Sequence, residues 1–309
     1  MYKVSVIIPN YNHSEFLRQR IDSVLAQTYQ NIEVIILDDC SPDDSREIIN
    51  EYKYHQKVSE IVFNTANSGS TFKQWQRGIA LAKGEYIWIA ESDDWCEPTL
   101  LATLMDGLRN NPTTGIAFCQ SMYYYEPNKV KETTYYPYYE NVEGGKDFIK
   151  QYMLSSNKIV NASMAVWKKD LFENVDLEFT SFKFCGDWLF WISILSQCDV
   201  FISGKVLNYF RNHDKDVSSR FYSTGDYFIE NLELYDLLQD RHILTPFMHE
   251  HLVKELYVRF LGVKKHLVRS NIYKIKRAFN MQAGLASLSR LYFTLRNQAF
   301  LLKRFILAK

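Results

Sequence analysis

Two pairs of adjacent carboxylates have the types and spacing to do chemistry. Asp38-Asp39 follows the mostly apolar run 32–37, and Asp93-Asp94 follows the mostly apolar run 85–90 after two intervening residues. Such runs predict strands buried on both faces of a parallel sheet, and ligands of these sheets bind beyond the carboxyl ends of the strands. One Asp-Asp pair alone is more typical of a turn. Two pairs at equivalent strand ends favour a hard divalent cation, and with it a nucleotide diphosphate.

The sequence does not contain the motifs that mark several other kinds of binding or catalytic site. The position after the first apolar run reads Pro9-Asn10-Tyr11-Asn12-His13, so the glycine-rich loop of dinucleotide-binding proteins is missing. A Walker lysine loop and the Gly-x-Ser-x-Gly elbow of hydrolases are also not found. The composition, 47% hydrophobic and 23% charged with no net charge, excludes a disordered chain. No uncharged apolar run reaches the roughly 18 residues of a membrane span.

The elements that must position the carboxylates alternate between strand and helix patterns over the first 122 residues, which predicts an α/β fold with a parallel sheet. A helix is expected to begin with Ser41 as its N-cap and Pro42 in its first turn. The tyrosine-rich segment 123–139 is interpreted as an excursion or flap rather than a packed layer. The remaining predicted elements are strands at 4–8, 32–37, 61–63, 85–90, 115–122, 162–167 and 206–210, helices at 16–25, 72–82, 98–109, 147–154 and 186–195, and helical structure from about residue 228.

The charge is unevenly distributed along the chain. Residues 256–309 contain twelve Lys and Arg and no Asp or Glu, so residues 1–255 hold all 36 acidic residues and only 24 basic ones. A basic segment on an acidic body indicates a polyanionic partner, either nucleic acid or an anionic membrane. Cations alternate with large apolar residues at 263–269 and 301–307, which is typical of a helix lying in a membrane surface. A helical bundle packed on the body or on a dimer partner remains an alternative.

Several motifs together resemble family 2 glycosyltransferases of the GT-A fold. They are, in order, Val4-Ser5-Val6-Ile7-Ile8-Pro9-Asn10-Tyr11-Asn12, Ser23-Val24-Leu25-Ala26-Gln27-Thr28-Tyr29, Leu37-Asp38-Asp39-Cys40-Ser41-Pro42-Asp43, Asn67-Ser68-Gly69, Ala82-Lys83-Gly84-Glu85-Tyr86-Ile87 and Glu91-Ser92-Asp93-Asp94-Trp95. The close resemblance covers about residues 1–120 and continues more loosely to about 220.

The resemblance implies roles for individual residues. Asp39 would accept a hydrogen bond from the uracil ring of the donor, in a pocket formed with Pro9 and Tyr11. Asp93 would bind the ribose, or a divalent metal, Mn²⁺ or Mg²⁺, that bridges the diphosphate. Glu91 stands where the family usually has Asp, and the usual Arg-Asn pair is replaced by residues 73–77. The other implied roles are Asp94 and His213 as metal ligands, Lys73 or Arg77 as a phosphate-binding cation, and Asp187 as the general base.

Taken by themselves, two of these residues have plainer interpretations. Asp187 near the start of a predicted helix would be an ordinary N-cap, and a lone loop histidine such as His213 is usually just exposed. The resemblance favours the catalytic interpretation of both, because Phe184-Cys185-Gly186-Asp187-Trp188 matches the late acidic motif and residues 208–213 match a Tyr-x-Arg-x-His segment.

The resemblance implies an α/β chain with a GT-A domain, its central sheet mostly parallel, over residues 1–220 and a basic helical region over 221–309. The expected activity is metal-dependent, inverting hexosyl transfer from a UDP-sugar to a glycan or lipid-linked acceptor. The alternative is a catalytically retired scaffold that binds sugar or membrane. We expect a cytoplasmic protein that its basic helices hold at the inner face of the plasma membrane. The alternative role of these helices is a contact between the two copies of a homodimer. We expect no nucleic-acid partner, because no recognised nucleic-acid-binding module accompanies the basic charge.

Overall fold

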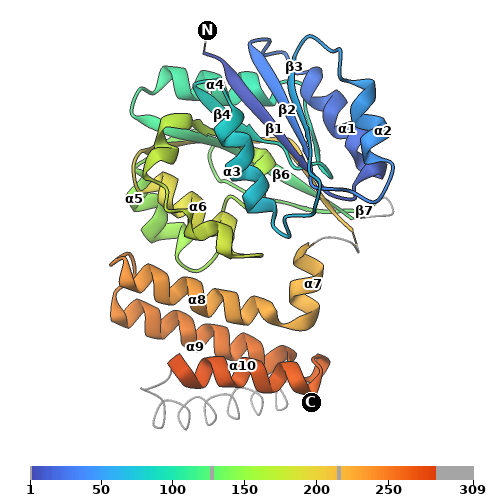
Figure 1. Ribbon diagram of the computed structural model, residues 1–309. Coiled ribbons are helices and arrows are strands. Elements are labelled where there is room, and N and C mark those ends of the chain that lie inside the picture. The colour runs from blue at the N-terminus through green and yellow to red at the C-terminus, as the bar shows by residue number, and fades with distance from the viewer. Residues whose placement is uncertain (1, 126–128, 214–216, 283–309) are drawn as a thin grey trace. The chain divides into compact units, whose positions relative to one another are not determined.

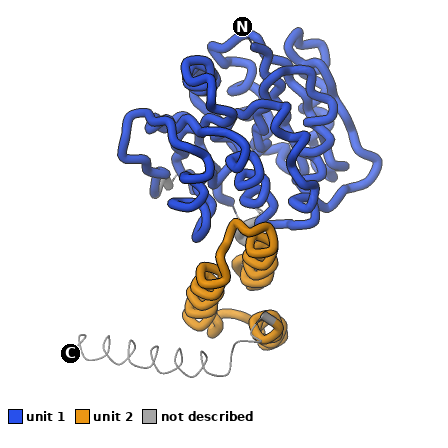
Figure 2. The backbone as a smooth tube through the Cα atoms, turned by 90° about the vertical axis from the view of Figure 1, so that its left-hand side faces the viewer, with its two compact units in different colours: residues 1–214 blue, residues 215–309 orange. Residues whose placement is uncertain are grey.

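The computed structural model describes residues 2–125, 129–213 and 217–282. Backbone contacts divide the chain into two compact units, Met1–Asp214 and Lys215–Lys309 (Figure 2). The first unit ends at Asp214, whereas the sequence analysis set the end of the catalytic domain at residue 220.

The first unit is built on one sheet, in the order β3-β2-β1-β4-β9-β6-β10-β5, with β7 beside β6 and β8 beside β10. Figure 1 labels the part β3-β2-β1-β4. Its strands are β1 (Val4–Asn10), β2 (Ile32–Asp38), β3 (Val58–Phe63), β4 (Tyr86–Ile89), β5 (Trp95–Cys96), β6 (Thr114–Tyr125), β7 (Lys129–Thr133), β8 (Glu140–Glu143), β9 (Ala165–Lys168) and β10 (Asp199–Asn212). The predicted α/β class is confirmed.

The sheet is mixed rather than mostly parallel. Among the described residues, four strand pairs are parallel and five are antiparallel. The parallel part is β3-β2-β1-β4, and β9 lies between β4 and β6 and runs antiparallel to both. Local hydrophobic patterns reveal the early strand–helix–strand units. They do not reveal that a strand from residues 165–168 inserts between two earlier ones.

The parallel strands bring their carboxyl ends to one edge of the sheet. All seven residues of β1 and of β2 are buried, as their apolar runs predicted. In the register of these strands Asn10 lies beside Asp38, and Ile7 lies beside Ile89 of β4. The loops after β1, β2 and β4 therefore leave the sheet at the same edge, which we call the carboxyl edge.

Helices pack on this sheet, and Figure 1 shows α1 and α2 together next to β1–β3. In α3, Gly78 packs directly on Ile7, where an added Cβ would lie 2.3 Å from a side-chain carbon. The first unit contains α1 (Ser14–Leu25), α2 (Ser45–Glu51), α3 (Thr71–Leu81), α4 (Leu100–Asn110), α5 (Gly145–Phe148), a π-helical turn η1 (Ile149–Met153), 3₁₀ turns η2 (Ala162–Met164), η3 (Lys169–Asn174) and η4 (Leu177–Ser181), and α6 (Gly186–Leu195).

Two local predictions are wrong. The helix after β2 begins at Ser45, and Ser41 is not its cap. The Ser41 hydroxyl instead accepts hydrogen bonds from the Asn12 backbone and the Asn10 side chain, so it ties the loop after β2 to the loop after β1. The segment 123–139 is partly sheet, because β6 continues to Tyr125 and β7 pairs with it. Its many polar side chains suit strands that are solvated on one face.

The second unit is helical, as predicted for the C-terminal extension. Its described elements are α7 (Val217–Thr224), α8 (Asp226–Asp240), α9 (Pro246–Val263), a 3₁₀ turn η5 (Lys264–His266) and α10 (Arg269–Gln282). Phe260 of α9 packs between Phe228 and Phe279, with ring centroids 5.5 and 5.9 Å away. Within the described residues, every helix is too short or too polar to cross a bilayer. The basic and apolar residues predicted at 301–307 lie outside the described residues.

Candidate active site

Three side chains that follow the ends of three strands meet at the carboxyl edge. His13 comes after β1, Asp93 after β4 and His213 after β10. One ligating atom from each lies within 4.8 Å of the other two, and all three side chains are half-buried. His213 Nε2 is 3.2 Å from Asp93 Oδ2. Two imidazoles and one carboxylate form a donor set that fits a divalent cation. We call these three residues the strand-end cluster.

The two predicted members of this cluster, Asp93 and His213, are thus brought together. Burial alone would raise the pKa of Asp93, but His13 and His213 outweigh it and lower the pKa below its usual value. Asp93 is therefore an ionised carboxylate at neutral pH, which is the form that binds a cation.

Asp94 does not belong to the cluster, although the sequence placed a metal on it. Its side chain has no exposed surface, and its Oδ2 accepts hydrogen bonds from Asn161 and Ser163. The backbone N–H of Arg211 donates to Oδ1, and the Arg20 guanidinium lies 3.6 Å from Oδ2. Both oxygens are therefore engaged inside the protein, and Asp94 holds neighbouring segments together.

Glu91, which stands where the family motif has Asp, points into the protein. Its Oε1 accepts a hydrogen bond of 2.8 Å from the indole N–H of Trp75. Burial raises its pKa to about 8, and the charge of Asp93 adds to the effect. The same two causes raise the pKa of Asp94. Of the three acidic residues in segment 91–94, Asp93 is thus the one whose pKa is lowered.

Alternate side chains at the end of β10 lie beside the cluster. Tyr209, Arg211 and His213 share one side of the chain, because successive side chains of a strand point to opposite faces. The Arg211 guanidinium lies 4.5 Å from the ring centroid of Trp95 and 4.4 Å from that of Phe16. Its Nε donates to the carbonyl of Asp93. Arg211 thus fixes the main chain that carries the cluster's carboxylate.

Asp39 organises a second network at the same edge. Its Oδ1 accepts from Asn64, Gln74 and the Ser68 backbone, and its Oδ2 accepts from the Ser68 backbone and hydroxyl. The carboxylate has about four lone-pair sites, and these donors occupy them. A base N–H that binds Asp39 must therefore replace an internal donor.

The other predicted nucleotide-binding residues border this network. Pro9 is buried within β1, whereas Tyr11, just beyond it, is 47% exposed. Lys73 and Arg77 are exposed on α3. The Lys73 ammonium is 3.5 Å from the carbonyl of Ser68, and the Arg77 guanidinium donates to Asn64. Both cations thus lie beside the residues that donate to Asp39.

Asp187 lies in the first turn of α6, but it is not the helix cap, because Cys185 occupies that position. Its Oδ2 accepts a 2.9 Å hydrogen bond from Asn157, and its Oδ1 accepts from the backbone of Trp188. Asn157 lies four residues before Asn161, which binds Asp94. The short segment 157–161 therefore touches both Asp187 and the acidic segment after β4.

The sequence analysis missed His13 and Arg20. His13 was considered only as part of a loop that lacks glycines. Arg20 stands among the apolar positions of α1, four residues after Phe16 and four before Val24, and it is fully buried. A cation at an apolar helix position signals a buried anionic partner, and Asp94 is that partner.

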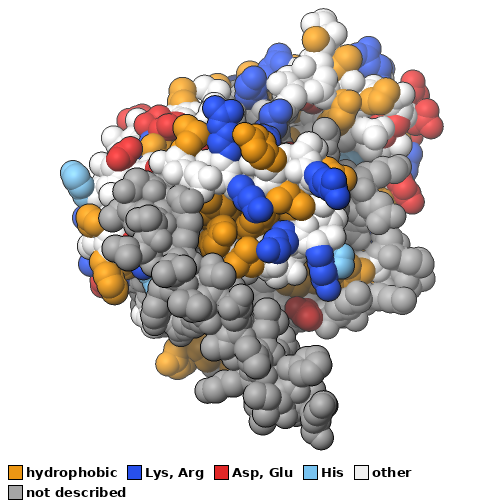
Figure 3. All heavy atoms as spheres, turned by 90° about the horizontal axis from the view of Figure 1, so that it is seen from below, with side chains coloured by type: hydrophobic (Ala, Val, Ile, Leu, Met, Phe, Trp, Pro, Cys, Tyr) orange, Lys and Arg blue, Asp and Glu red, His pale blue; other side chains and the backbone are white. Residues whose placement is uncertain are grey.

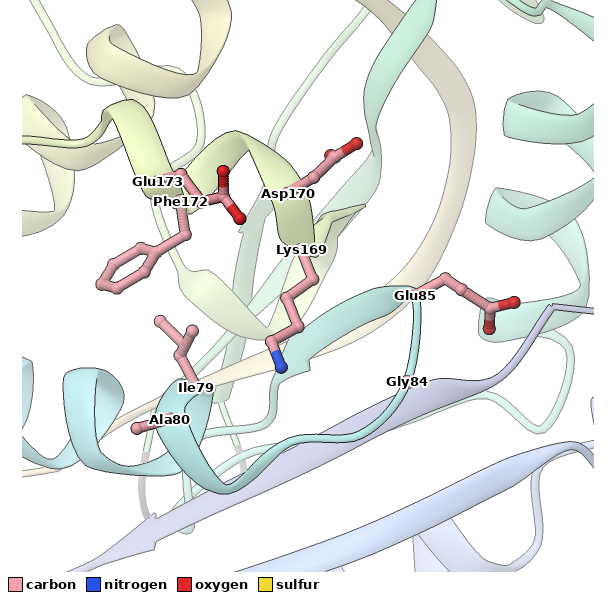
Figure 4. A pocket seen from close by; sticks show the side chains of 8 residues that line it. All are labelled: Ile79, Ala80, Gly84, Glu85, Lys169, Asp170, Phe172 and Glu173. Atoms are coloured by element: carbon pink, nitrogen blue, oxygen red, sulfur yellow. The ribbon is translucent and has the colours of Figure 1, made fainter.

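A pocket of about 480 Å³ lies at the opposite edge of the sheet, where β4 begins (Figure 4). Ile79 and Phe172 face each other across it, and the Lys169 ammonium donates to the carbonyl of Ala82. It contains none of the predicted site residues.

Residues 5–175 match the profile of glycosyl transferase family 2. The chain belongs to this family. The resemblance in the sequence is thereby confirmed, and the carboxyl edge is where the family's motifs converge in this chain.

Curated relatives match part of this family 2 chain. Glycosyltransferase GlyG of Streptococcus pneumoniae is 38% identical over 101 residues, which are 33% of either chain. The poly(ribitol-phosphate) beta-glucosyltransferase of Bacillus spizizenii is 37% identical over 95 residues, 30% of this chain and 15% of that protein. The aligned segments thus span a third or less of these relatives.

Solved structures share the fold over most of the chain. Staphylococcus aureus TarS 1–349 in complex with UDP-GlcNAc has a TM-score of 0.64 and 18% identity, covering 84% of this chain and 73% of that one. The mannosyltransferase PcManGT of Pyrobaculum calidifontis, in complex with GDP-Man and Mn²⁺, has a TM-score of 0.55 and 15% identity, covering 95% of this chain and 84% of that one.

Proposed function

We propose that this family 2 chain is an inverting, metal-dependent glycosyltransferase of the hexosyltransferase type that moves a sugar from a UDP-sugar to a glycan hydroxyl. The strand-end cluster carries the proposal, since it places an ionised carboxylate and two imidazoles where sheets of this class bind ligands. TarS, which shares the fold, was solved with UDP-GlcNAc, and this supports UDP as the nucleotide.

In this proposal the donor lies along the carboxyl edge. The exposed ring of Tyr11 stacks on the base, beside Pro9 and the loop that Asp39 holds. Lys73 or Arg77, which border that loop, binds phosphate oxygens. Asp93, with His213, holds the divalent cation. When bound, the cation stabilises the negative charge that develops on the leaving diphosphate.

Asp187 is the proposed general base. The acceptor oxygen forms a bond to the anomeric carbon as the bond from that carbon to the diphosphate breaks, and the hydroxyl proton passes to Asp187. A single displacement inverts the configuration and needs no second carboxylate as nucleophile. The segment 157–161 links the two regions, since Asn157 donates to Asp187 and Asn161 donates to Asp94 of the acidic segment.

Donor turnover by the purified full chain tests the proposal. We expect UDP release from a panel of UDP-sugars with Mn²⁺ present, with water accepting the sugar in place of the glycan, and loss of release in Asp93→Asn. Asp106→Asn is the matched control, because Asp106 is exposed and pairs only with Arg109 in the described structure. Binding of UDP without any turnover by the unaltered chain would instead support the retired scaffold.

We propose that the acceptor is a surface glycan on a lipid carrier, and that the second unit docks on an anionic membrane at the cytoplasmic face. The exposed side chains of Val268 and Tyr273 lie close in sequence to the exposed cations Lys264, Lys265 and Arg269. Figure 3 shows lysine and arginine side chains among hydrophobic ones on the face viewed from below. Each cation near an anionic leaflet contributes on the order of 1 kcal/mol to the free energy of membrane binding.

Flotation with phosphatidylglycerol-containing vesicles tests the docking. The double variant Lys264→Glu/Lys265→Glu should lose vesicle binding, whereas Lys53→Glu/Lys83→Glu, which alters exposed lysines of the first unit, should keep it. If both variants float like the unaltered chain while the first one dissociates a dimer in sedimentation, the surface is a contact between copies.

A further inference from the structure

We propose that His13 is the third protein ligand of the cation site, and that its two imidazoles and one carboxylate select a transition ion such as Mn²⁺ over Mg²⁺. The family motif alone pointed to a site dominated by carboxylates. The structure removes Asp94 from it and adds a second histidine. The role of the cation in sugar transfer rests on the proposed function, but its binding does not.

The distances within the strand-end cluster match those between ligands of one ion. Two ligands at right angles, each about 2.1 Å from an ion, are about 3.0 Å apart, and opposite ligands are about 4.2 Å apart. His213 Nε2 and Asp93 Oδ2 are 3.2 Å apart, and all three ligating atoms lie within 4.8 Å. Side-chain shifts of less than an ångström would therefore close the three groups around one cation.

The acidic segment itself orients the ring of His13. His13 Nδ1 is 2.8 Å from the hydroxyl of Ser92, a buried residue directly before Asp93. A ligand histidine ordinarily has its second ring nitrogen hydrogen-bonded in this way, which fixes the tautomer and aims the other nitrogen at the metal. Ser92 thus leaves Nε2 of His13 for the cation.

Packing holds both rings near Asp93. The His13 and His213 rings meet edge to face with centroids 5.4 Å apart. Phe16, in the first turn of α1, lies against both, at 5.0 Å from His213 and 6.3 Å from His13. Arg211 packs on the same phenyl ring and anchors the Asp93 carbonyl. The three ligands are thus held by contacts that the protein makes without a ligand.

The charge balance suits a cation that must also bind a diphosphate. Arg20 and three hydrogen-bond donors engage Asp94, so Asp93 is the one carboxylate of the cluster. A divalent ion held by one carboxylate and two neutral imidazoles keeps a net charge of +1. Three protein ligands also leave coordination positions for phosphate oxygens.

The donor set decides which ion binds. Mg²⁺ prefers oxygen ligands and gives up its water reluctantly, whereas imidazole suits transition ions. We therefore expect the site to bind Mn²⁺ weakly, Co²⁺ and Zn²⁺ more tightly, and Mg²⁺ least.

Electron spin-echo spectroscopy of Mn²⁺ on the full chain, without nucleotide, tests the assignment directly. The unaltered chain should show couplings to two directly bound ¹⁴N nuclei, and His13→Gln should show one. His55→Gln is the matched control, since His55 is exposed in a loop after α2. Absence of ¹⁴N coupling in the unaltered chain, which needs no variant, would overturn the proposal, as would an unchanged spectrum in His13→Gln.

Titration calorimetry measures the selectivity. His13→Gln should weaken Mn²⁺ binding by at least about 10- to 100-fold, in line with losses at other metal sites. Displacement of Mn²⁺ should require at least a hundredfold excess of Mg²⁺, and displacement at equal concentration would refute the selectivity. The melting temperature without metal should match the unaltered chain's, which shows that His13→Gln is folded.

The two proposals fail separately. A chain that binds Mn²⁺ through both histidines but releases no UDP refutes the glycosyltransferase function and keeps the site. A chain that turns over UDP-sugars equally with Mg²⁺ and Mn²⁺, and is unaffected by His13→Gln, refutes the site and keeps the function.

Discussion

Buried carboxyl groups at the two edges of the central sheet include groups whose pKa values are shifted in opposite directions. At the edge where β1, β2 and β4 begin, which we call the amino edge, Glu33 is 3% exposed. It accepts hydrogen bonds from the Ser5 hydroxyl and the Lys83 backbone and pairs with Lys3 at 2.8 Å. Burial opposes its ionisation, but these partners prevail and lower its pKa.

At the carboxyl edge, internal partners do not keep the pKa values of Glu91 and Asp94 low. Burial and the charge of Asp93 raise the pKa of Glu91 to about 8 and also raise that of Asp94. A cation bound beside Asp93 would lower both pKa values. A buried carboxylate that is hydrogen-bonded and paired with a cation of the protein thus stabilises the fold. Neighbouring carboxyl groups whose pKa values are raised instead indicate a place for a bound cation.

The largest effect we expect is on catalysis at the carboxyl edge, from Asp187→Asn. Without a proton acceptor, kcat should fall by about 100- to 10,000-fold. UDP binding should stay the same, because the donor is held by other residues. Stopped assays of UDP release with calorimetry of UDP binding measure both, and Asp176→Asn, near the same region of chain, is the control. An unchanged kcat would remove the base role.

Asp94→Ala should produce the largest loss of stability. It leaves Arg20, which has no exposed surface, without its partner. Breaking a buried ion pair from one side costs about 3–5 kcal/mol. Denaturant unfolding followed by tryptophan fluorescence measures this loss, and Asp106→Ala, at an exposed pair, should change little. If Asp94→Ala loses metal binding at full stability instead, Asp94 is a ligand and our separation of it from Asp93 is wrong.

How far the sequence predicted this site depends on the type of signal. The mostly apolar runs of β1 and β2 predicted strands because only a sheet covered on both faces buries every side chain. The place of Asp93 at the carboxyl edge followed from the parallel order. Which of two adjacent aspartates turns inward does not follow, since it depends on Asn161 and Ser163, nearly seventy residues later.

The other residues that the sequence analysis overlooked or assigned wrongly have the same cause. His13 joins the cluster only because three loops meet in space, and no periodicity records that meeting. Ser41 looked like a helix cap because it precedes a proline and acidic residues, yet its hydroxyl has better partners at the end of β1 and in the loop after it. Local rules fail where a side chain's partner is distant in sequence.

Glu33→Gln should lower the free energy of unfolding by about 1–3 kcal/mol, because Gln keeps the shape but loses the charge-assisted hydrogen bonds. This loss is smaller than the one expected for Asp94→Ala. The lowered pKa of Glu33 means that its stabilisation is present above the unfolded value, about 4.3, and is lost as pH falls through the folded value. The stability difference between the unaltered chain and Glu33→Gln should therefore shrink below about pH 4. Glu60→Gln, at an exposed position, is the control. A difference that grows on acidification would contradict the comparison.

Of the four variants predicted here, Lys3→Met should have the smallest effect, a slight loss in the free energy of unfolding. The Lys3 side chain is 38% exposed, so solvent screens its attraction to Glu33. Pairs of this kind contribute about 0–1 kcal/mol. Glu33 also keeps the Ser5 hydroxyl and the Lys83 N–H, which donate to it from fixed positions. The pKa of Glu33, followed by NMR of its carboxyl carbon, should rise in Lys3→Met but stay below that of Glu91. A Glu33 pKa that reaches the range of Glu91 would show that one exposed lysine, rather than the buried hydrogen bonds, makes the amino edge differ from the carboxyl edge.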